Sequence, residues 1–491
     1  MSLPRFQHYI DGAFADAKRD FESVDPATGE PWAIMPAADA ADVERAVAAA
    51  RRALAAPEWA GLTATARGRL LYRLGDLLAA NAQRLAELET RDTGKIIRET
   101  SAQVAYMAEY YRYFAGLADK VEGAHLPADK PEMDVTLRRE PIGVVAAVVP
   151  WNSQLMLSAV KLGPALAAGC SVVLKASEDG PAPLLEFARL VHEAGFPPGV
   201  VNVVTGFGED CGKALTSHPD VARIAFTGGP ATARHILRNS AENLAVTSLE
   251  LGGKSPIAVF DDADLDSAAN AVIAGIFAAS GQSCVAGSRL LVQRGLRDAL
   301  IERLVARAPQ IRIGDPQDRT TEMGPLATRR QLERIEAIVA DSRAQGAELL
   351  TGGERPAGLG GGFYYRPTIL LCPRSGIPSA MEELFGPVLS VLTFADEEEA
   401  VALANDTRYG LAAGVFTRDL ARAHRLVRRI RAGIVWVNTY RAVSPVVPFG
   451  GFGLSGMGRE GGRESVLDYT RVKAVWIRTS DTPIGDPFVM R

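Results

Sequence analysis

The feature that most constrains the fold is a regular alternation of short apolar runs and helical segments, which begins near residue 143. It consists of Gly143 to Val149, Ser158 to Ala168, Ser171 to Lys175, Pro183 to Glu193, Val200 to Val204, Ala222 to Phe226 and Thr232 to Glu242. Continuous β-branched runs of this kind suit parallel strands that are buried on both faces. The sequence therefore predicts an α/β fold with a doubly wound, Rossmann-like sheet.

A second series of the same kind begins near Asp264 and predicts a second α/β domain. Its segments are a helix at Leu265 to Ala279, a strand at Arg289 to Gln293 and a helix at Leu296 to Ala308. The other predicted elements are strands at His8 to Ile10 and Phe21 to Val24, amphipathic helices at Asp42 to Ala56 and Ala64 to Thr90, and isolated strands at Asp134 to Arg138 and Arg471 to Arg478.

The charge and hydropathy of the chain exclude several classes of partner. A net charge of −4 over 491 residues gives no broad basic surface for nucleic acid or an anionic membrane, so a small soluble ligand is favoured. No window reaches the ~18 consecutive apolar residues of a spanning helix. The first eight residues also lack a basic segment followed by an apolar one, and we expect a cytoplasmic protein.

The cysteines and histidines predict neither a disulfide framework nor a metal site. The four cysteines lie far apart without a CxxC pair, and the six histidines show no metal-ligand spacing. Cys284 follows a run of small residues, Ala278 to Ser283. Alone, this pattern is typical of a buried, small apolar cysteine, but a cysteine on a tight turn after a helix that ends at Gly281 could also be a nucleophile.

Two other polar residues stand where catalysis and a structural role are both consistent with the pattern. Glu250 lies between Leu249 and Leu251, so it is either a general base with a pKa raised by burial or a carboxylate bonded to backbone N–H groups at a strand end. Asn152 follows a predicted strand, at the edge where open α/β sheets bind ligands. Its alternative role is to cap the next helix.

Cofactor signals taken from general rules are mixed. Gly206 to Gly212 has the pattern GxGxxxG, one residue longer than the usual dinucleotide fingerprint, and is equally consistent with a plain glycine-rich turn. Lys175 and Glu178 lie at the end of a predicted strand. They could bind a cofactor there, or they could form an ion pair on the surface. Glu382 and Glu383 could be a solvated acidic pair.

Four motifs taken together resemble the NAD(P)-dependent aldehyde dehydrogenase superfamily over nearly the whole chain. They are Pro150-Trp151-Asn152, Leu249-Glu250-Leu251-Gly252-Gly253-Lys254, Gly281-Gln282-Ser283-Cys284 and Glu383-Leu384-Phe385-Gly386-Pro387. The resemblance implies that Cys284 attacks an aldehyde, that Asn152 helps to hold the oxyanion and that Glu250 activates the water that hydrolyses a thioester. Lys161 and Glu460 match a proton-exit pair of some members.

The resemblance also implies the binding residues and the domain plan. Cofactor contacts are expected from Val149, Trp151, Lys175, Glu178, Gly208, Gly212, Phe226, Gly228, Gly229, Leu251, Gly252, Glu383 and Phe385. An aldehyde tunnel is expected from Ser153, Leu157, Val160, Val285, Val443 and Phe449. The expected domains are a cofactor-binding domain at 1–121 and 142–252, a catalytic domain at 253–452 and an oligomerisation segment at 122–141 and 468–491, which would form a homodimer or homotetramer.

One departure from the family pattern concerns the cofactor. The family commonly has a serine after Phe-Thr-Gly, where this chain has Gly229 followed by Pro230. We expect a phosphate contact to be lost and binding to survive, because proline fits the first turn of a helix and the exposed N–H groups there attract phosphate.

The sequence thus predicts an NAD-preferring enzyme, with NADP left open, that oxidises an aldehyde to a carboxylic acid. Glu250 favours hydrolysis over acyl transfer to coenzyme A. The alternative is a catalytically silent binding or structural protein on the same fold. Arg441, beside Tyr440, could meet an acidic or aromatic substrate or be solvated.

Overall fold

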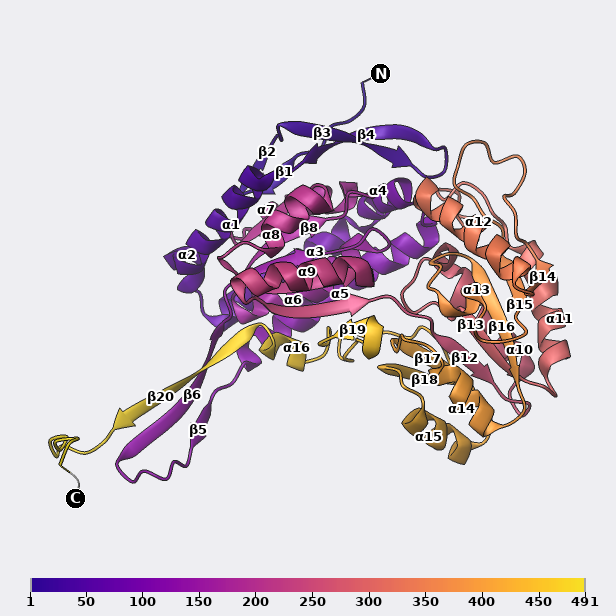
Figure 1. The fold of residues 1–491 in the computed structure, drawn as a ribbon. Helices are drawn as coiled ribbons and strands as arrows, with labels where there is room; N and C mark the ends of the chain where they lie inside the picture. Colours follow the sequence, from indigo (N-terminus) through magenta and orange to yellow (C-terminus); the bar gives the residue numbers. More distant parts are fainter. Residues whose placement is uncertain (1, 490–491) are drawn as a thin grey trace.

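The computed structural model describes residues 2–489, which contain two large sheets surrounded by helices and two small sheets (Figure 1). The eight-stranded sheet has the order β19 (Gly456–Met457), β11 (Val246–Leu251), β10 (Val221–Gly228), β7 (Val144–Val148), β8 (Ser171–Ala176), β9 (Val201–Thr205), β1 (His8–Ile10) and β2 (Ala13–Ala15). The five strands from β11 to β9 run parallel. At the edges, β19 is antiparallel to β11, β1 is antiparallel to β9, and β2 is antiparallel to β1.

The predicted alternation of strands and helices is confirmed in this sheet. Helices α6 (Gln154–Ala168) and α7 (Ala182–Ala194) connect β7 to β8 and β8 to β9. Every residue of β7, β8 and β9 is buried, as expected for parallel strands that are covered on both faces. Because the strands are parallel, the segments that follow β7, β8, β10 and β11 all emerge at one edge of the sheet.

The second predicted α/β unit is also present and contains a seven-stranded sheet. Its order is β14 (Glu348–Thr351), β15 (Thr368–Leu371), β16 (Val388–Phe394), β13 (Arg289–Gln293), β12 (Pro256–Val259), β17 (Ala412–Phe416) and β18 (Ile434–Val437). Only β14 is antiparallel to its neighbour. Its helices are α10 (Leu265–Phe277), α11 (Arg297–Arg307), α12 (Arg329–Ala344), α13 (Pro378–Met381), α14 (Glu397–Asn405) and α15 (Leu420–Arg429), with short helical turns at η3 (Ala278–Gly281) and η4 (Ala308–Gln310).

The two isolated strand candidates pair with each other. β20 (Thr470–Arg478) lies antiparallel to β6 (Met133–Pro141) along its full length, and β5 (Ala124–Leu126) completes a three-stranded sheet. This sheet extends away from the rest of the molecule (Figure 1). Its exposed apolar side chains include Val472, Trp476 and Ile477.

The remaining elements pack around the first large sheet and its helices. They are α1 (Ala40–Ala55), α2 (Pro57–Ala60), α3 (Ala64–Ala80), α4 (Ala82–Thr93), α5 (Ile97–Leu117), η1 (Ala118–Lys120), η2 (Gly208–Gly212), α8 (Lys213–Thr216), α9 (Pro230–Asn243), η5 (Gly453–Ser455), α16 (Glu464–Leu467) and the hairpin of β3 (Arg19–Asp25) and β4 (Glu30–Ala37). Within residues 2–489, no helix combines the length and apolarity that crossing a bilayer requires.

Most predicted helices differ from the structure by one or two residues at their ends, and three differences have a clear physical cause or a larger size. The helix predicted at Ala64 to Thr90 is two helices, because Asn81 leaves helical geometry and its side chain donates to Leu77 O at 2.9 Å. α6 begins four residues before the predicted start at Ser158. α10 ends at Phe277, before the predicted end, because Ala278 leaves helical geometry and Ala279 and Ser280 adopt left-handed backbone angles.

Candidate active site

The turn that carries Cys284 is built from residues in an unusual backbone conformation. Ala279 and Ser280 have φ angles of 53° and 54°, and Gly281 has a φ of 73°. Left-handed angles are costly for residues with a Cβ, so neighbouring groups must hold them. The Ala279 N–H donates to Glu99 Oε1 at 2.8 Å, and the Ser280 hydroxyl donates to the Gly324 carbonyl at 2.9 Å.

Cys284 lies partly exposed at the end of this turn, so it is not the fully buried cysteine of the structural alternative. Burial raises the pKa of its thiol to about 12, and the nearby carboxylates of Glu383 and Glu250 raise it further. These surroundings favour the protonated thiol near neutral pH.

Asn152 is held against the turn of Cys284. Its Nδ2 donates to the Gln282 carbonyl at 3.0 Å, whereas the residue at the N-cap of α6 is Ser153. The alternative in which Asn152 caps the helix is wrong. Because a carboxamide has two N–H groups, one stays available for another acceptor.

Glu250 lies in β11, where it pairs with Gly456 of β19. Glu250 is only 3% exposed, and among residues 2–489 neither of its carboxylate oxygens has a hydrogen-bond partner. The alternative of a strand-end carboxylate bonded to backbone N–H groups is therefore wrong. Burial raises the pKa of Glu250 well above its usual range, and the carboxylate of Glu460 raises it further, while Lys161 acts in the opposite direction.

Lys161 and Glu460 form a buried ion pair near Glu250. The Lys161 ammonium is fully buried and donates to Glu460 and, at 2.7 Å, to the Thr227 hydroxyl. Backbone hydrogen bonds between Glu460 and Phe449, of 2.6 and 2.8 Å, hold the late glycine-rich loop at this place. The two residues are far apart in the sequence, and the fold brings them together.

The glycines after Glu250 allow three parts of the site to approach one another. The Gly253 N–H donates to Glu383 Oε1 at 3.0 Å, and Glu383 occupies the space that a Cβ on Gly252 would fill. A Cβ on Gly253 would lie 2.6 Å from the Cys284 carbonyl oxygen. Burial raises the pKa of Glu383 to about 7, whereas Glu382 is exposed. The solvated acidic pair is therefore wrong for Glu383.

Trp151 and Phe385 lie at one side of this cluster. Their ring centroids are 5.3 Å apart and their planes are perpendicular, an edge-to-face contact. Phe385 has a left-handed φ of 56°. Val149 directly follows β7, and Leu251 is the last residue of β11. Both residues are buried.

Lys175 is buried at the end of β8 and is not part of a surface ion pair. Its Nζ donates to the Ala176 carbonyl at 3.0 Å and lies 3.4 Å from Glu178 Oε2. The position of a Cβ on Gly212 would be 3.8 Å from Lys175 Cε, so the glycine-rich segment packs against this lysine. Gly208 is exposed, and Gly208–Gly212 forms one π-helical turn.

Gly229 lies at the N-cap of α9, and Pro230 occupies the first helical turn, as predicted. A Cβ on Gly229 would meet no atom within 4 Å, so the space above the helix start is open. Gly228 lies against the ring of Phe226, which leaves no room for a side chain there. The helix start therefore presents free N–H groups to an anion.

The six residues expected to line a tunnel do not form one cluster. Val285 and Phe449 pack with Cys284. Leu157 and Val160 lie on α6 and pack against the core of the first unit. Val443 is 46% exposed, and its carbonyl accepts from the Tyr106 hydroxyl at 3.3 Å.

Ser153 belongs to a polar network that the sequence did not indicate. Lys95, between α4 and α5, is 5% exposed, and its ammonium donates to Ser153 Oγ at 2.6 Å and to Gln103 Oε1 at 2.9 Å. The Ser153 hydroxyl lies 2.7 Å from the Asn152 carbonyl, to which it donates. Neither Lys95 nor Gln103 falls in a recognisable motif, and only the fold reveals their place.

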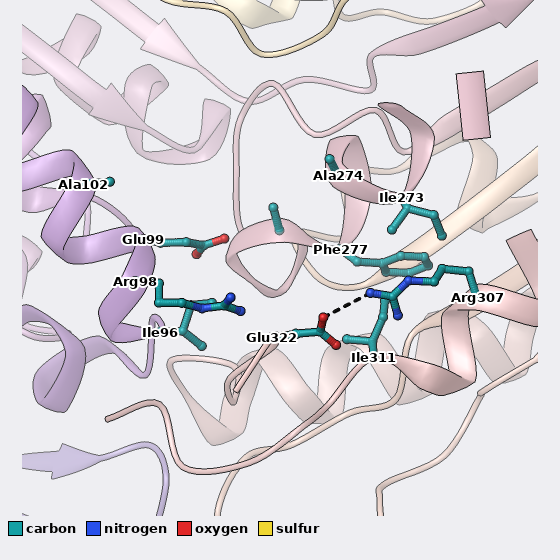
Figure 2. Close-up of a pocket in the computed structure, with 11 residues that line it drawn as sticks. Ile96, Arg98, Glu99, Ala102, Ile273, Ala274, Phe277, Arg307, Ile311 and Glu322 are labelled. Carbon is teal, nitrogen blue, oxygen red and sulfur yellow. Dashed lines mark hydrogen bonds and ion pairs between the residues drawn. The ribbon is translucent and has the colours of Figure 1, made fainter. Parts of the chain in front are cut away.

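A pocket of about 400 Å³ is lined by residues of α5, α10 and α11 and of the segments next to them (Figure 2). Its wall includes Glu99, which binds the turn, and Ala278, which begins it, together with the ion pair of Arg307 and Glu322 at 3.1 Å. None of its lining residues is Cys284, Glu250 or Asn152, so the pocket is separate from the candidate catalytic groups. Within the described residues, no three His, Cys, Asp or Glu side chains are grouped as metal ligands.

Comparison with known proteins identifies the family. The model of the aldehyde dehydrogenase family matches residues 14–475. The chain is 63% identical, over the full length of both proteins, to (Z)-2-((N-methylformamido)methylene)-5-hydroxybutyrolactone dehydrogenase of Acinetobacter baylyi. The crystal structure of a putative aldehyde dehydrogenase from Burkholderia cenocepacia superposes with a TM-score of 0.96 at 47% identity and covers 99% of each chain.

A third relative is betaine aldehyde dehydrogenase from Staphylococcus aureus in complex with NAD+. It is 37% identical, with a TM-score of 0.95, and the match covers 97% of this chain and 95% of the relative. The matches agree in family and span nearly the whole chain. The chain therefore belongs to the aldehyde dehydrogenase family and is an enzyme that oxidises aldehydes.

Proposed function

We propose that the protein is an NAD-dependent aldehyde dehydrogenase that releases a carboxylic acid by hydrolysis of a thioester on Cys284. The observation that carries the proposal is the state of Glu250, a buried carboxylate that has no hydrogen-bond partner within residues 2–489. Leaving such a group unpaired costs several kcal/mol in an apolar setting. A carboxylate with a raised pKa is a suitable general base near neutral pH. This catalytic role explains why Glu250 is buried without a partner despite the cost in stability.

The first part of the cycle depends on Cys284 and Asn152. The Cys284 thiol must lose its proton, after which its sulfur forms a bond to the aldehyde carbon and the carbonyl oxygen becomes an oxyanion. The Asn152 N–H that is not bonded to Gln282 is free to donate to that oxyanion. A donor of this kind contributes about 3 kcal/mol in acyl transfer.

The residues that the structure gathers fit NAD. Glu178 is partly exposed beside Lys175 and can accept from ribose hydroxyls, and the open start of α9 at Gly229 can receive phosphate. Glu383, held by the Gly253 N–H, is a suitable acceptor for the second ribose. Bound NAD supplies a hydride acceptor, which allows the adduct on Cys284 to become a thioester.

The second part of the cycle depends on Glu250. Its carboxylate takes a proton from water, the resulting hydroxide adds to the thioester carbon, and the bond to the Cys284 sulfur breaks. The Lys161–Glu460 pair lies close enough to act on the pKa of Glu250, and the Glu460 carboxylate can accept the proton next. An alternative in which the fold is catalytically silent has no support, since the chain belongs to an enzyme family.

For the substrate, we propose the 5-hydroxybutyrolactone class that the name of the Acinetobacter baylyi relative gives for that enzyme. Identity of 63% over the complete length supports a shared substrate class. In such a compound, one ring carbon carries both the hydroxyl group and the ring oxygen, which is the oxidation level of an aldehyde.

We further propose that residues 1–121 and 142–252 bind the cofactor, that 253–452 form the catalytic domain and that 122–141 and 468–491 mediate a homodimer or homotetramer. The exposed apolar side chains on the three-stranded sheet support the last role. The cytoplasmic location stays a prediction.

The proposal is tested by mixing the purified protein with NAD and a panel of aldehydes and recording reduced nicotinamide by its absorbance. Cys284→Ala should abolish turnover and leave NAD affinity close to that of the wild type. Turnover by the variant at a substantial fraction of the wild-type rate would show that another group forms the adduct, and the mechanism would be wrong.

A further inference from the structure

We propose that Lys95 and Arg441 form a cationic subsite beside Cys284, which receives a carboxylate of the substrate and makes the enzyme selective for aldehydes that carry one. The proposal rests on the proposed function, because it concerns the same site. It assigns a substrate class to the enzyme, and it assigns a role to two residues that lie outside the four family motifs.

The first half of this subsite is the Lys95 ammonium. It is buried within hydrogen-bond distance of Ser153, the residue next to Asn152, and of Gln103 on α5. Its ionic partner, Glu89, is 3.9 Å away, beyond hydrogen-bond distance, and both carboxylate oxygens of Glu89 lack a partner within the described part of the chain. The two acceptors within hydrogen-bond distance, on Ser153 and Gln103, are neutral, and the Glu89 carboxylate is more distant. The positive charge of Lys95 is therefore incompletely compensated.

Burial shifts the pKa values of Lys95 and Glu89 in directions that favour the binding of an additional anion. It lowers the pKa of Lys95 and raises the pKa of Glu89, so the surroundings favour the neutral forms of both. A carboxylate that arrives beside Lys95 would stabilise its charged form. The site is thus better satisfied with an anionic ligand than without one.

The second half is the Arg441 guanidinium. Arg441 has a left-handed φ of 64°, a conformation that its neighbours must hold, and it is partly exposed. Its Nη1 donates to the Ala274 carbonyl at 3.1 Å, and within residues 2–489 it forms no ion pair with a carboxylate. The remaining N–H groups suit a carboxylate, which a guanidinium binds through two parallel bonds.

Both cations act on the same place. The guanidinium of Arg441 opposes the rise in the pKa of Cys284 and also lowers the pKa of Lys95, so its charge reaches both groups. Ser153 links Lys95 to Asn152, and Tyr440, the neighbour of Arg441, donates to the carbonyl of Val285 at 3.0 Å, so both cations lie next to residues that contact the Cys284 turn.

The chemistry of the proposed substrate class supplies a carboxylate for such a subsite. Cys284 can add only to the carbon of a C=O group. In a 5-hydroxybutyrolactone, the carbon that carries the hydroxyl group has no C=O bond. When the hydroxyl proton leaves, that oxygen forms a C=O bond and the bond from the same carbon to the ring oxygen breaks. The products are an aldehyde and a carboxylate in one molecule, with no change in oxidation state. The ring-opened form therefore presents its aldehyde to Cys284 and its carboxylate to Lys95 and Arg441.

The test compares 4-oxobutanoate with its methyl ester, which has the same chain and aldehyde but no charge. The wild type should show a kcat/KM for the acid about tenfold to a hundredfold above that for the ester, since hydrogen bonds to charged groups contribute on that scale. Arg441→Gln and Lys95→Met should each bring this ratio toward one. Arg428→Gln is the matched control, because Arg428 is exposed on α15 and has no ion pair in the described part of the chain; it should keep the wild-type ratio.

The outcomes separate the subsite from the proposed function. A wild type that oxidises acid and ester equally well would overturn the subsite and leave the dehydrogenase in place, and one that oxidises neither with NAD would overturn both. Equal losses on acid and ester in the Lys95→Met and Arg441→Gln variants would show a positioning role, through Ser153 and Asn152 for Lys95, and would also overturn the subsite. If Lys95→Met fails to fold by circular dichroism, Arg441→Gln on its loop decides alone.

Discussion

Replacing Gly253 by alanine should separate the two halves of the active site. The added Cβ would lie 2.6 Å from the Cys284 carbonyl oxygen and 3.3 Å from Leu411 Cβ. Ordinary contact begins at 3.4 Å, so the end of β11 and the Cys284 turn would have to move apart by about 0.8 Å. A backbone carbonyl cannot rotate away as a flexible side chain can, and the displacement should reach the reacting sulfur.

The size of the effect follows from this displacement. A misplacement of about 1 Å in a catalytic group can cost roughly a hundredfold in rate. Gly253→Ala should therefore lower kcat by up to about a hundredfold, while NAD affinity changes less, because Lys175 and Glu178 lie on β8 and the loop after it. The measurement is steady-state NAD reduction together with NAD binding by fluorescence.

Gly295→Ala is the matched control. Neither Gly253 nor Gly295 has a left-handed backbone, and a Cβ on Gly295 would meet only Asp261, at 3.7 Å. The control should keep wild-type turnover. Wild-type kcat in a folded Gly253→Ala variant would refute the argument, since the close approach of β11 to the Cys284 turn would then have no bearing on catalysis.

Three further predictions concern the thiol, the cofactor and assembly. Because the pKa of Cys284 is about 12 instead of 9.0, iodoacetamide should label the cofactor-free protein roughly a thousandfold more slowly near pH 7 than an ordinary cysteine, and about tenfold faster for each pH unit gained; fast labelling that does not change with pH would contradict this. The Glu178 carboxylate should repel the 2′-phosphate of NADP, so kcat/KM should be larger with NAD, and Glu178→Gln should narrow the ratio; a preference for NADP would reverse the assignment. The exposed edge and Trp476 of the three-stranded sheet should produce a dimer or tetramer in light scattering at micromolar concentration, and a monomer alone would reject this.

The elements predicted best from the sequence are those with strong local patterns. The buried runs of β7, β8 and β9 have few polar residues, and this composition alone distinguishes them from half-exposed strands. The break at Asn81 and the early end of α10 were missed because they depend on a side-chain cap and on a strained turn held by Glu99 and Gly324. Such contacts are far apart in sequence and have no local pattern.

The candidate site shows the same division. Cys284, Glu250 and Asn152 lie in motifs and were predicted, but their surroundings were not. The absence of any partner for the Glu250 oxygens within residues 2–489, and the raised pKa values of Glu250 and Cys284, depend on segments that are distant in sequence, such as the loop of Gly450 and Glu460 beside Glu250. Lys95 was missed because a lysine in a short connection gives no signal until the fold places it beside Ser153.

The most direct test of the account is the fate of the thioester in Glu250→Gln. Glutamine keeps the size of the side chain but cannot take a proton, so Cys284 should still be acylated once while hydrolysis stops. Rapid mixing with NAD and aldehyde should show a burst of reduced nicotinamide near one equivalent per site followed by very slow turnover, and mass spectrometry should find the acyl group on Cys284. Loss of the burst together with turnover would contradict the account, because Glu250 would then be needed to activate the thiol and not to deprotonate water.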